Sequence, residues 1–250
     1  MWIKTMAIAD RRQREKEQRR TEILDTAERL FFSRGYDDVS MDEIANEVEL
    51  NKATIYLYFR NKEALLSAIV LRGFAHLNRM YRECVETRVT GITKISLMGR
   101  AYYRFNQQYP DYLRMIRYYG SDRFRKDESP ELTDILAASA ESRSLICSVV
   151  QEGIDDGTIR NDLDPLEMTL FLMISFMTIL SLENKWITIL DDRGISHETF
   201  AQDFLRFITP AVDARATLEK PHFIDIKGFE SFGSISLALE PIAVERKKKK

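Results

Sequence analysis

The spacing of apolar residues constrains the fold of this 250-residue chain more than any other feature. From residue 18 to about residue 212, apolar side chains recur three and four positions apart, which is the period of an amphipathic helix. Helix-breaking residues are scarce, with ten glycines and six prolines in the whole chain. The sequence therefore predicts an all-α fold, and its length allows one large domain or two smaller ones.

Capping residues mark the predicted boundaries of four helices in the N-terminal part. A first helix ends at Gly35, and Ser40 with Glu43 forms a capping box for a second helix over 41–48. Asn51 begins a short third helix that is expected to end near Phe59. A fourth, longer helix follows Asn61 and runs at least to Leu77.

The remainder of the apolar pattern predicts a second, larger helical unit. Its expected helices cover 92–108, 111–119, 130–156, 165–188 and 197–212. Pro165 favours the first position of the fourth of these helices, and Ser196 caps the last. The pattern changes after Asp213, where alternating apolar residues and a basic end indicate an extension over 214–250, either a hairpin or partly disordered.

The segment over 166–182 is apolar on nearly all sides and raises the question of a membrane. It is shorter than a usual spanning helix, contains Glu167 and has no basic flanks. A helix that is apolar all round also occurs inside a protein core or between subunits. We favour burial over a membrane span.

Composition and motifs favour a cytoplasmic protein that is not an enzyme. No signal-peptide-like run appears near the N-terminus, where Met6 is a candidate start. Cys84 and Cys147 lie far apart, and His76, His197 and His222 have no partners at metal-ligand spacing. The chain has no glycine-rich phosphate loop and no nucleophile elbow, so we expect no metal, cofactor or catalytic residues.

Two short helices joined by residues 49–51 have the spacing of a helix-turn-helix. On the second helix, Ile55 and Phe59 point toward the other helices, and the opposite face carries small, aromatic and hydroxyl side chains. Apolar groups can contact thymine methyls in the major groove, lysine can reach guanine or phosphate, and hydroxyls suit phosphate oxygens. The predicted DNA-binding residues are Ser40, Lys52, Ala53, Thr54, Tyr56, Leu57, Tyr58 and Lys62.

Two further features support a DNA partner locally, although the formal net charge is only -2. Lys62 lies at the start of a capped helix, and a helix N-terminus binds phosphate well. The stretch over 11–20 holds six basic and two acidic residues and overlaps a predicted basic N-terminal arm over 1–17. It is either a frayed, solvated helix start or an arm that follows the adjacent groove.

The stretch TAERLFFSRGYDDVSMDEIANEVELNKATIYLYFRNKEALL resembles the DNA-binding domain of the tetracycline-repressor (TetR) family of transcriptional regulators. The resemblance covers about residues 20–70 and includes Gly35, Tyr36, Ile44-Ala45 and Asn61-Lys62-Glu63. One departure is Glu49, where such sequences usually have glycine in the turn. A left-handed backbone at this position would disfavour glutamate.

The resemblance implies a homodimer that binds a palindromic operator, usually as a repressor, and is released by a small molecule. It also implies a DNA-binding domain over 18–66 and an effector-binding and dimerisation domain over 67–213. A twofold protein on a twofold DNA site agrees with the usual geometry of helix-turn-helix proteins. The alternative is a helical scaffold or adaptor whose helix-turn-helix no longer binds DNA.

The effector site is predicted from a dense aromatic cluster over 102–124, which either packs as an ordinary core or forms the wall of an apolar pocket. Arg143 falls within an apolar stripe, so it either pairs with Glu167 or Glu183 or anchors an anionic group of the effector. The predicted ligand-binding residues are Tyr102, Asn106, Tyr112, Tyr119, Arg143, Cys147, Phe171 and Ser175. The predicted dimer interface comprises Phe176, Leu180, Phe200, Phe204 and Phe207.

Overall fold

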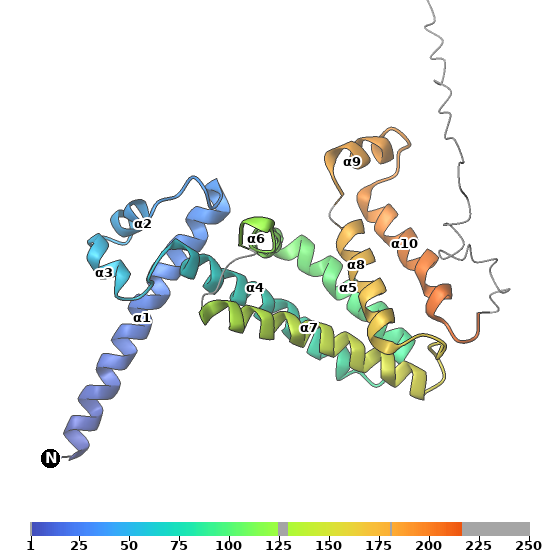
Figure 1. The fold of residues 1–250 in the computed structure, drawn as a ribbon, viewed down its shortest axis with the longest axis horizontal. Coiled ribbons are helices and arrows are strands. Elements are labelled where there is room, and N and C mark those ends of the chain that lie inside the picture. Colours follow the sequence, from blue (N-terminus) through green and yellow to red (C-terminus); the bar gives the residue numbers. More distant parts are fainter. Residues whose placement is uncertain (1, 125–129, 181, 217–250) are drawn as a thin grey trace, which may run out of the picture. The chain divides into compact units, whose positions relative to one another are not determined.

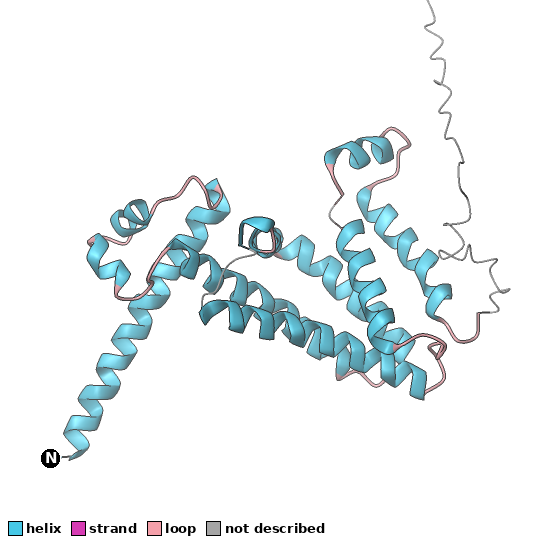
Figure 2. Cartoon of the chain, in the orientation of Figure 1, coloured by secondary structure: helices cyan, strands magenta, loops and turns pink. Residues whose placement is uncertain are grey.

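The structure is a computed structural model that describes residues 2–124, 130–180 and 182–216. All the secondary-structure elements assigned in these residues are helices (Figure 2), which confirms the all-α prediction. A single antiparallel bridge joins Ile159 to Asp213. The predicted hairpin lies almost wholly outside the described residues.

The N-terminal helices are α1 (Trp2–Arg34), α2 (Met41–Glu47), α3 (Lys52–Tyr56) and α4 (Lys62–Val85) (Figure 1). Three predicted caps are confirmed. Ser40 and Glu43 form the complete capping box of α2. Asn51 and Asn61 each accept a hydrogen bond from the backbone N–H three residues later, at 2.8 Å. These side chains satisfy donors that a helix start leaves unpaired.

The later elements are α5 (Gly91–Gln108), α6 (Pro110–Tyr119), η1 (Asp122–Phe124), α7 (Pro130–Asp155), α8 (Pro165–Ile179), α9 (Asn184–Asp191) and α10 (His197–Val212). The predicted starts at Pro165 and after Ser196 are confirmed. The predicted continuous helix over 165–188 is wrong, because the chain leaves helical geometry after Ile179 and begins α9 at Asn184. The helix expected to end near Phe59 also ends earlier, at Tyr56.

The apolar face of α1 forms the centre of the N-terminal core. Ile23, Ala27 and Phe31 are fully buried, and Ile44 of α2 and Ile55 of α3 are buried with them. This shared core positions α2 and α3 on one side of α1. By contrast, the side chains over 11–20 are all exposed, although their backbone continues α1 without a break. The stretch predicted as an arm is therefore the first part of a long helix.

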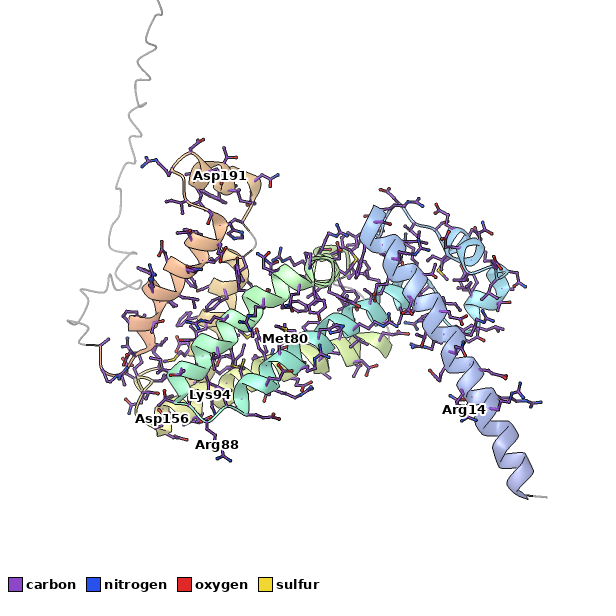
Figure 3. The ribbon with its side chains drawn as sticks, turned by 180° about the vertical axis from the view of Figure 1, so that it is seen from behind. Arg14, Met80, Arg88, Lys94, Asp156 and Asp191 are labelled. Carbon is purple, nitrogen blue, oxygen red and sulfur yellow. The ribbon has the colours of Figure 1, made fainter. Side chains whose placement is uncertain are left out.

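Helices α4 and α7 pack side by side, with α5 against both (Figure 1). Gly91 permits a close approach of α5 to α7, since a Cβ atom there would lie 2.2 Å from the Cα of Gly153. Lys94 is buried nearby and donates to both carboxylate oxygens of Glu152, at 2.7 and 2.8 Å. Figure 3 shows Lys94 on the same end of this helical unit as Asp156.

Within the protomer, the apolar helix α8 is buried on one side only, and its burial between subunits stays a prediction. Met168 and Leu172 are buried, but Leu170, Phe171 and Ile174 are exposed. No single described helix is both long and apolar enough to cross a membrane; α8 and α9 pass a test of length and composition only as a pair, with a 73° bend between them.

Candidate DNA-binding surface and ligand cavity

The turn between α2 and α3 determines which side chains of α3 face outward. Leu50 closes the turn by donating its backbone N–H to the carbonyl of Ala45, at 2.9 Å. Ile55 then anchors α3 in the core. Tyr56 and Leu57 remain exposed, at 43% and 78% of their surface. An apolar side chain this exposed at the C-terminal end of α3 suits contact with a base edge in the major groove.

The polar residues around α3 differ in how free they are to reach DNA. Lys52 and Ala53 are exposed, although the Lys52 ammonium pairs with Asp42 at 2.8 Å and its pKa is raised by that hydrogen bond. The Thr54 hydroxyl donates to Asn51 at 2.9 Å. Ser40 is committed to its capping box. Tyr58 is half-buried against the core, so its predicted outward direction is only partly realised.

Lys62 does not present a free cation to DNA, which corrects its predicted direction. Its ammonium donates to the carbonyl of Val39 at 2.5 Å and lies 4.1 Å from the centre of the Tyr36 ring. Partial burial lowers the pKa of this lysine. Lys62 therefore holds the loop between α1 and α2 against the start of α4.

A cavity of about 740 Å³ lies among α4, α5, α6, α7 and α8. Most of its wall is aliphatic or aromatic, as in typical binding pockets for apolar small molecules. The lining residues are Val70, Phe74, Leu77, Tyr81, Ile95, Met98, Gly99, Tyr102, Leu113, Ile116, Arg117, Tyr119, Gly120, Ser121, Phe124, Leu132, Ile135, Leu136, Ser139, Ser142, Ile146, Leu172, Met173, Phe176 and Met177.

Three polar side chains from three helices approach one another at the cavity wall. Burial raises the pKa of Tyr81 on α4, and the electrostatic influence of Tyr102 on α5 acts in the same direction. Burial also raises the pKa of Tyr102, against the opposing effect of the Arg117 guanidinium on α6. Both phenols therefore stay protonated at neutral pH and can donate hydrogen bonds.

The segment over 116–124 touches the cavity and the DNA-binding helices with different side chains. Tyr119 and Phe124 line the cavity. Tyr118 donates its hydroxyl to Asp37 in the loop between α1 and α2, at 2.7 Å, and Arg123 pairs with the other oxygen of Asp37 at 2.5 Å. These two bonds lower the pKa of the Asp37 carboxyl. The network connects one wall of the cavity directly to the loop before α2.

Comparison with known proteins agrees with this arrangement. The family model described as bacterial regulatory proteins, tetR family, matches residues 23–69. The HTH-type transcriptional repressor KstR2 of Rhodococcus jostii is 28% identical over 151 residues, which are 60% of this chain and 72% of that protein. KstR2 of Mycolicibacterium smegmatis is 23% identical over 147 residues, covering 58% and 70%. Residues 23–69 of this chain form a DNA-binding domain of the TetR family.

A solved structure shows that the likeness in fold extends beyond the DNA-binding helices. The ketosteroid transcriptional regulator KstR2 of Mycobacterium tuberculosis superposes with a TM-score of 0.57 at 18% identity, over 78% of this chain and 95% of the other. Glu49 is the point of departure from the usual TetR-family turn. Its φ of 55° lies in the left-handed region, the backbone conformation in which glutamate is disfavoured.

The structure brings two of the predicted effector residues to the cavity, Tyr102 and Tyr119. The other six predicted residues are absent from its described lining: Asn106, Tyr112, Arg143, Cys147, Phe171 and Ser175. Tyr112 packs against Phe32, with ring centres 5.1 Å apart, and Phe171 is 54% exposed. Ser139, Ser142 and Ile146 of α7 line the cavity, whereas Arg143 on the same helix does not.

Neither interpretation of Arg143 is supported. The side chain is half-buried and pairs with no acidic group among the described residues, Glu167 and Glu183 included. Sequence reasoning instead missed Arg117, which faces the cavity from α6. One feature of the sequence indicated Arg117: it lies between Ile116 and Tyr119, on a helix that was expected to carry aromatic pocket residues.

The predicted dimer residues divide into two groups. Phe176 and Leu180 are used inside the protomer: Phe176 lines the cavity and packs against Phe204 at 5.3 Å, and Leu180 is buried. Phe200 and Phe204 are half-buried. Phe207 is 79% exposed. Together with Leu166, Leu170, Phe171 and Ile174 it gives what we call the α8–α10 apolar surface.

Proposed function

We propose that this chain is a ligand-responsive repressor that binds a palindromic operator as a homodimer. A small, largely apolar effector in the cavity would release it from DNA. The observation that carries the proposal is the shared segment over 116–124, which lines the cavity and also contacts the loop before α2. A ligand that displaces this segment changes the support of the DNA-binding helices.

A second contact between the two regions supports the same coupling. Arg60, between α3 and α4, pairs with Glu131 at the start of α7, at 2.6 Å. The next residue, Leu132, lines the cavity. Two walls of the cavity therefore contact the DNA-binding domain, one at the loop before α2 and one at the segment after α3. A ligand shifts the equilibrium between two conformations only by its difference in affinity for them. These contacts would transmit such a shift from the cavity to α3.

The α8–α10 apolar surface supports the homodimer. Helices α8 and α10 lie side by side (Figure 1), and their exposed Leu170, Ile174 and Phe207 have no apolar cover among the described residues. Exposed apolar surface beyond scattered single residues is typical of an interaction site. A twofold pairing through it would place two copies of α3 for two operator half-sites. The relatives named as repressors support the direction of regulation.

The test is selection of DNA from randomised duplexes by the purified full-length protein. We expect enrichment of an inverted repeat, with half-sites about one helical turn apart. The scaffold or adaptor alternative predicts no enriched sequence. Enrichment of a single half-site without its inverted copy would contradict the dimeric part of the proposal and leave DNA binding intact.

A further inference from the structure

The described lining of the cavity carries one charged side chain, and it is positive. Arg117 contributes its guanidinium from α6, and none of the described lining residues is acidic. No acidic side chain in the described part of the chain pairs with Arg117. The other polar groups of the described wall are the hydroxyls of tyrosines and serines. The cavity therefore has an apolar interior and a single cationic group.

The surroundings of Arg117 form a polar end of the cavity. Tyr102 is close enough for the guanidinium to influence its hydroxyl, and Tyr102 in turn influences Tyr81. All three side chains line the cavity, and they come from three separate helices. All three groups are hydrogen-bond donors, so each of them suits an acceptor group of a ligand in the cavity.

Arg117 lines the cavity but its side chain is exposed, so a ligand that fills the cavity removes only part of its water. A cation that loses its water without gaining an anion is strongly disfavoured. A neutral ligand would therefore bind against a part of this penalty, whereas a ligand with a carboxylate would gain an ion pair with the guanidinium. The flat fork of a guanidinium matches the two oxygens of a carboxylate, and such charge-assisted hydrogen bonds are about twice as strong as neutral ones.

We propose that the effector is an apolar molecule with one terminal carboxylate, and that Arg117, Tyr102 and Tyr81 bind this group at the polar end of the cavity. The proposal rests on the proposed function, since it specifies the chemical class of the effector. It also assigns the anionic anchor to α6 instead of to Arg143 on α7.

The experiment compares carboxylates with neutral analogues of the same carbon skeleton, by isothermal titration calorimetry on the full-length protein. The probes are dodecanoate with dodecanol, and cyclohexanebutyrate with cyclohexanebutanol, so that a flexible and a ring-bearing skeleton are both tested. We expect at least one carboxylate to bind about 10- to 100-fold more tightly than its alcohol, the range given by hydrogen bonds to a charged group.

Variants separate the role of Arg117 from general packing. Arg117→Met should bring the affinity for the carboxylate down to that for the alcohol, and Arg117→Lys should keep part of the preference. Arg143→Met is the matched control, because Arg143 lies outside the described lining and its loss should leave the preference unchanged. The comparison on the unaltered protein needs no variant and stands even if Arg117→Met fails to fold.

Three results would overturn the inference: equal affinities for acid and alcohol, a preference that survives Arg117→Met, or no binding of any of the four probes. If the protein still selects an operator in any of these cases, the proposed function stands and only the effector class is wrong. If the carboxylate preference is found but no operator is selected, the proposed function fails, and the assignment of carboxylate binding to the polar end of the cavity stands.

Discussion

At the scale of single residues, the backbone conformation of Glu49 destabilises the turn between α2 and α3. Its φ of 55° places a side-chain-bearing residue in the left-handed region, which is unfavourable by roughly 1–2 kcal/mol. Glycine removes this penalty but loses part of the gain through its greater freedom in the unfolded chain, about 0.5–1 kcal/mol.

We therefore expect Glu49→Gly to raise the free energy of unfolding by about 0.5–1 kcal/mol, measured by urea denaturation. Glu47→Gly is the control. Glu47 ends α2 with ordinary helical geometry and pairs with Arg29, so this change should destabilise the protein by about 1 kcal/mol. Similar effects of the two glycines would show that backbone strain at Glu49 is unimportant.

Leu57 and Tyr56 are adjacent residues with different expected roles on DNA. Leu57→Ala should relax the preference at one or two base pairs, at about 1–3 kcal/mol, because it removes an apolar contact with a base. Tyr56→Phe should weaken binding to all sequences alike, because it removes a hydroxyl that suits phosphate. Randomised-oligonucleotide selection distinguishes them, and an unchanged selected site for Leu57→Ala would show that Leu57 does not face the bases.

At the scale of elements, the start of α2 depends on an ionised Glu43. Its carboxylate accepts from the Ser40 backbone at 2.7 Å and from Arg34 at 2.8 Å, and these bonds lower its pKa from 4.5 to about 2. A carboxyl with a lowered folded-state pKa stabilises the protein above its unfolded pKa. The contribution is then lost as the pH falls through the folded-state value.

We expect the cap of α2 to weaken between about pH 4.5 and pH 2, and to be at full strength above that window. Glu43→Gln should remove this part of the pH dependence, because glutamine carries no titrating group. Stability curves from urea denaturation at several pH values measure it. Glu22→Gln on α1 is the control for the loss of a carboxylate elsewhere in the chain. An identical pH slope for Glu43→Gln and the unaltered protein would contradict the assignment.

The connection between the cavity and the loop before α2 depends on Asp37. Asp37→Asn removes the charge that pairs with Arg123 and weakens the bond from Tyr118. We expect faster amide hydrogen exchange over 36–40 and 118–124 in this variant. Asp38→Asn is the matched control, since the adjacent exposed carboxylate has no described ionic partner. Equal acceleration in both variants would indicate loop charge in general, not this network.

At the scale of the whole molecule, assembly is expected to depend on the α8–α10 apolar surface. Phe207→Glu places a charge on an exposed part of it and should give monomers with an intact protomer fold, seen by analytical ultracentrifugation and circular dichroism. These monomers should bind operator poorly, because only one half-site is engaged. Phe204→Glu should also destabilise the protomer, because Phe204 packs against Phe176. A dimeric Phe207→Glu protein would exclude this interface.

The sequence predicted the N-terminal helices well because their boundaries are determined locally. Ser40, Asn51 and Asn61 cap backbone groups within three residues, so their roles are visible in the sequence. The cavity depends instead on which faces of α6 and α7 meet, and the period of each segment alone does not determine this. The sequence therefore pointed to Arg143 on α7 and missed Arg117 on α6. Lys62 was misplaced because its partners, Val39 and Tyr36, lie over twenty residues earlier in the chain.

The segment over 116–124 also has a consequence for how regulators of this kind can diverge. Neighbouring positions there serve two purposes: Tyr119 and Phe124 contact the cavity, and Tyr118 and Arg123 contact Asp37. A mutation that adapts this wall to a new effector alters at the same time how strongly the effector is transmitted. The part of the wall that contains Ser139, Ile146 and Leu172 makes no such contact with the loop before α2 among the described residues. New effector preferences should therefore arise first on α7 and α8, and lineages that change α6 should show compensating changes in the loop before α2.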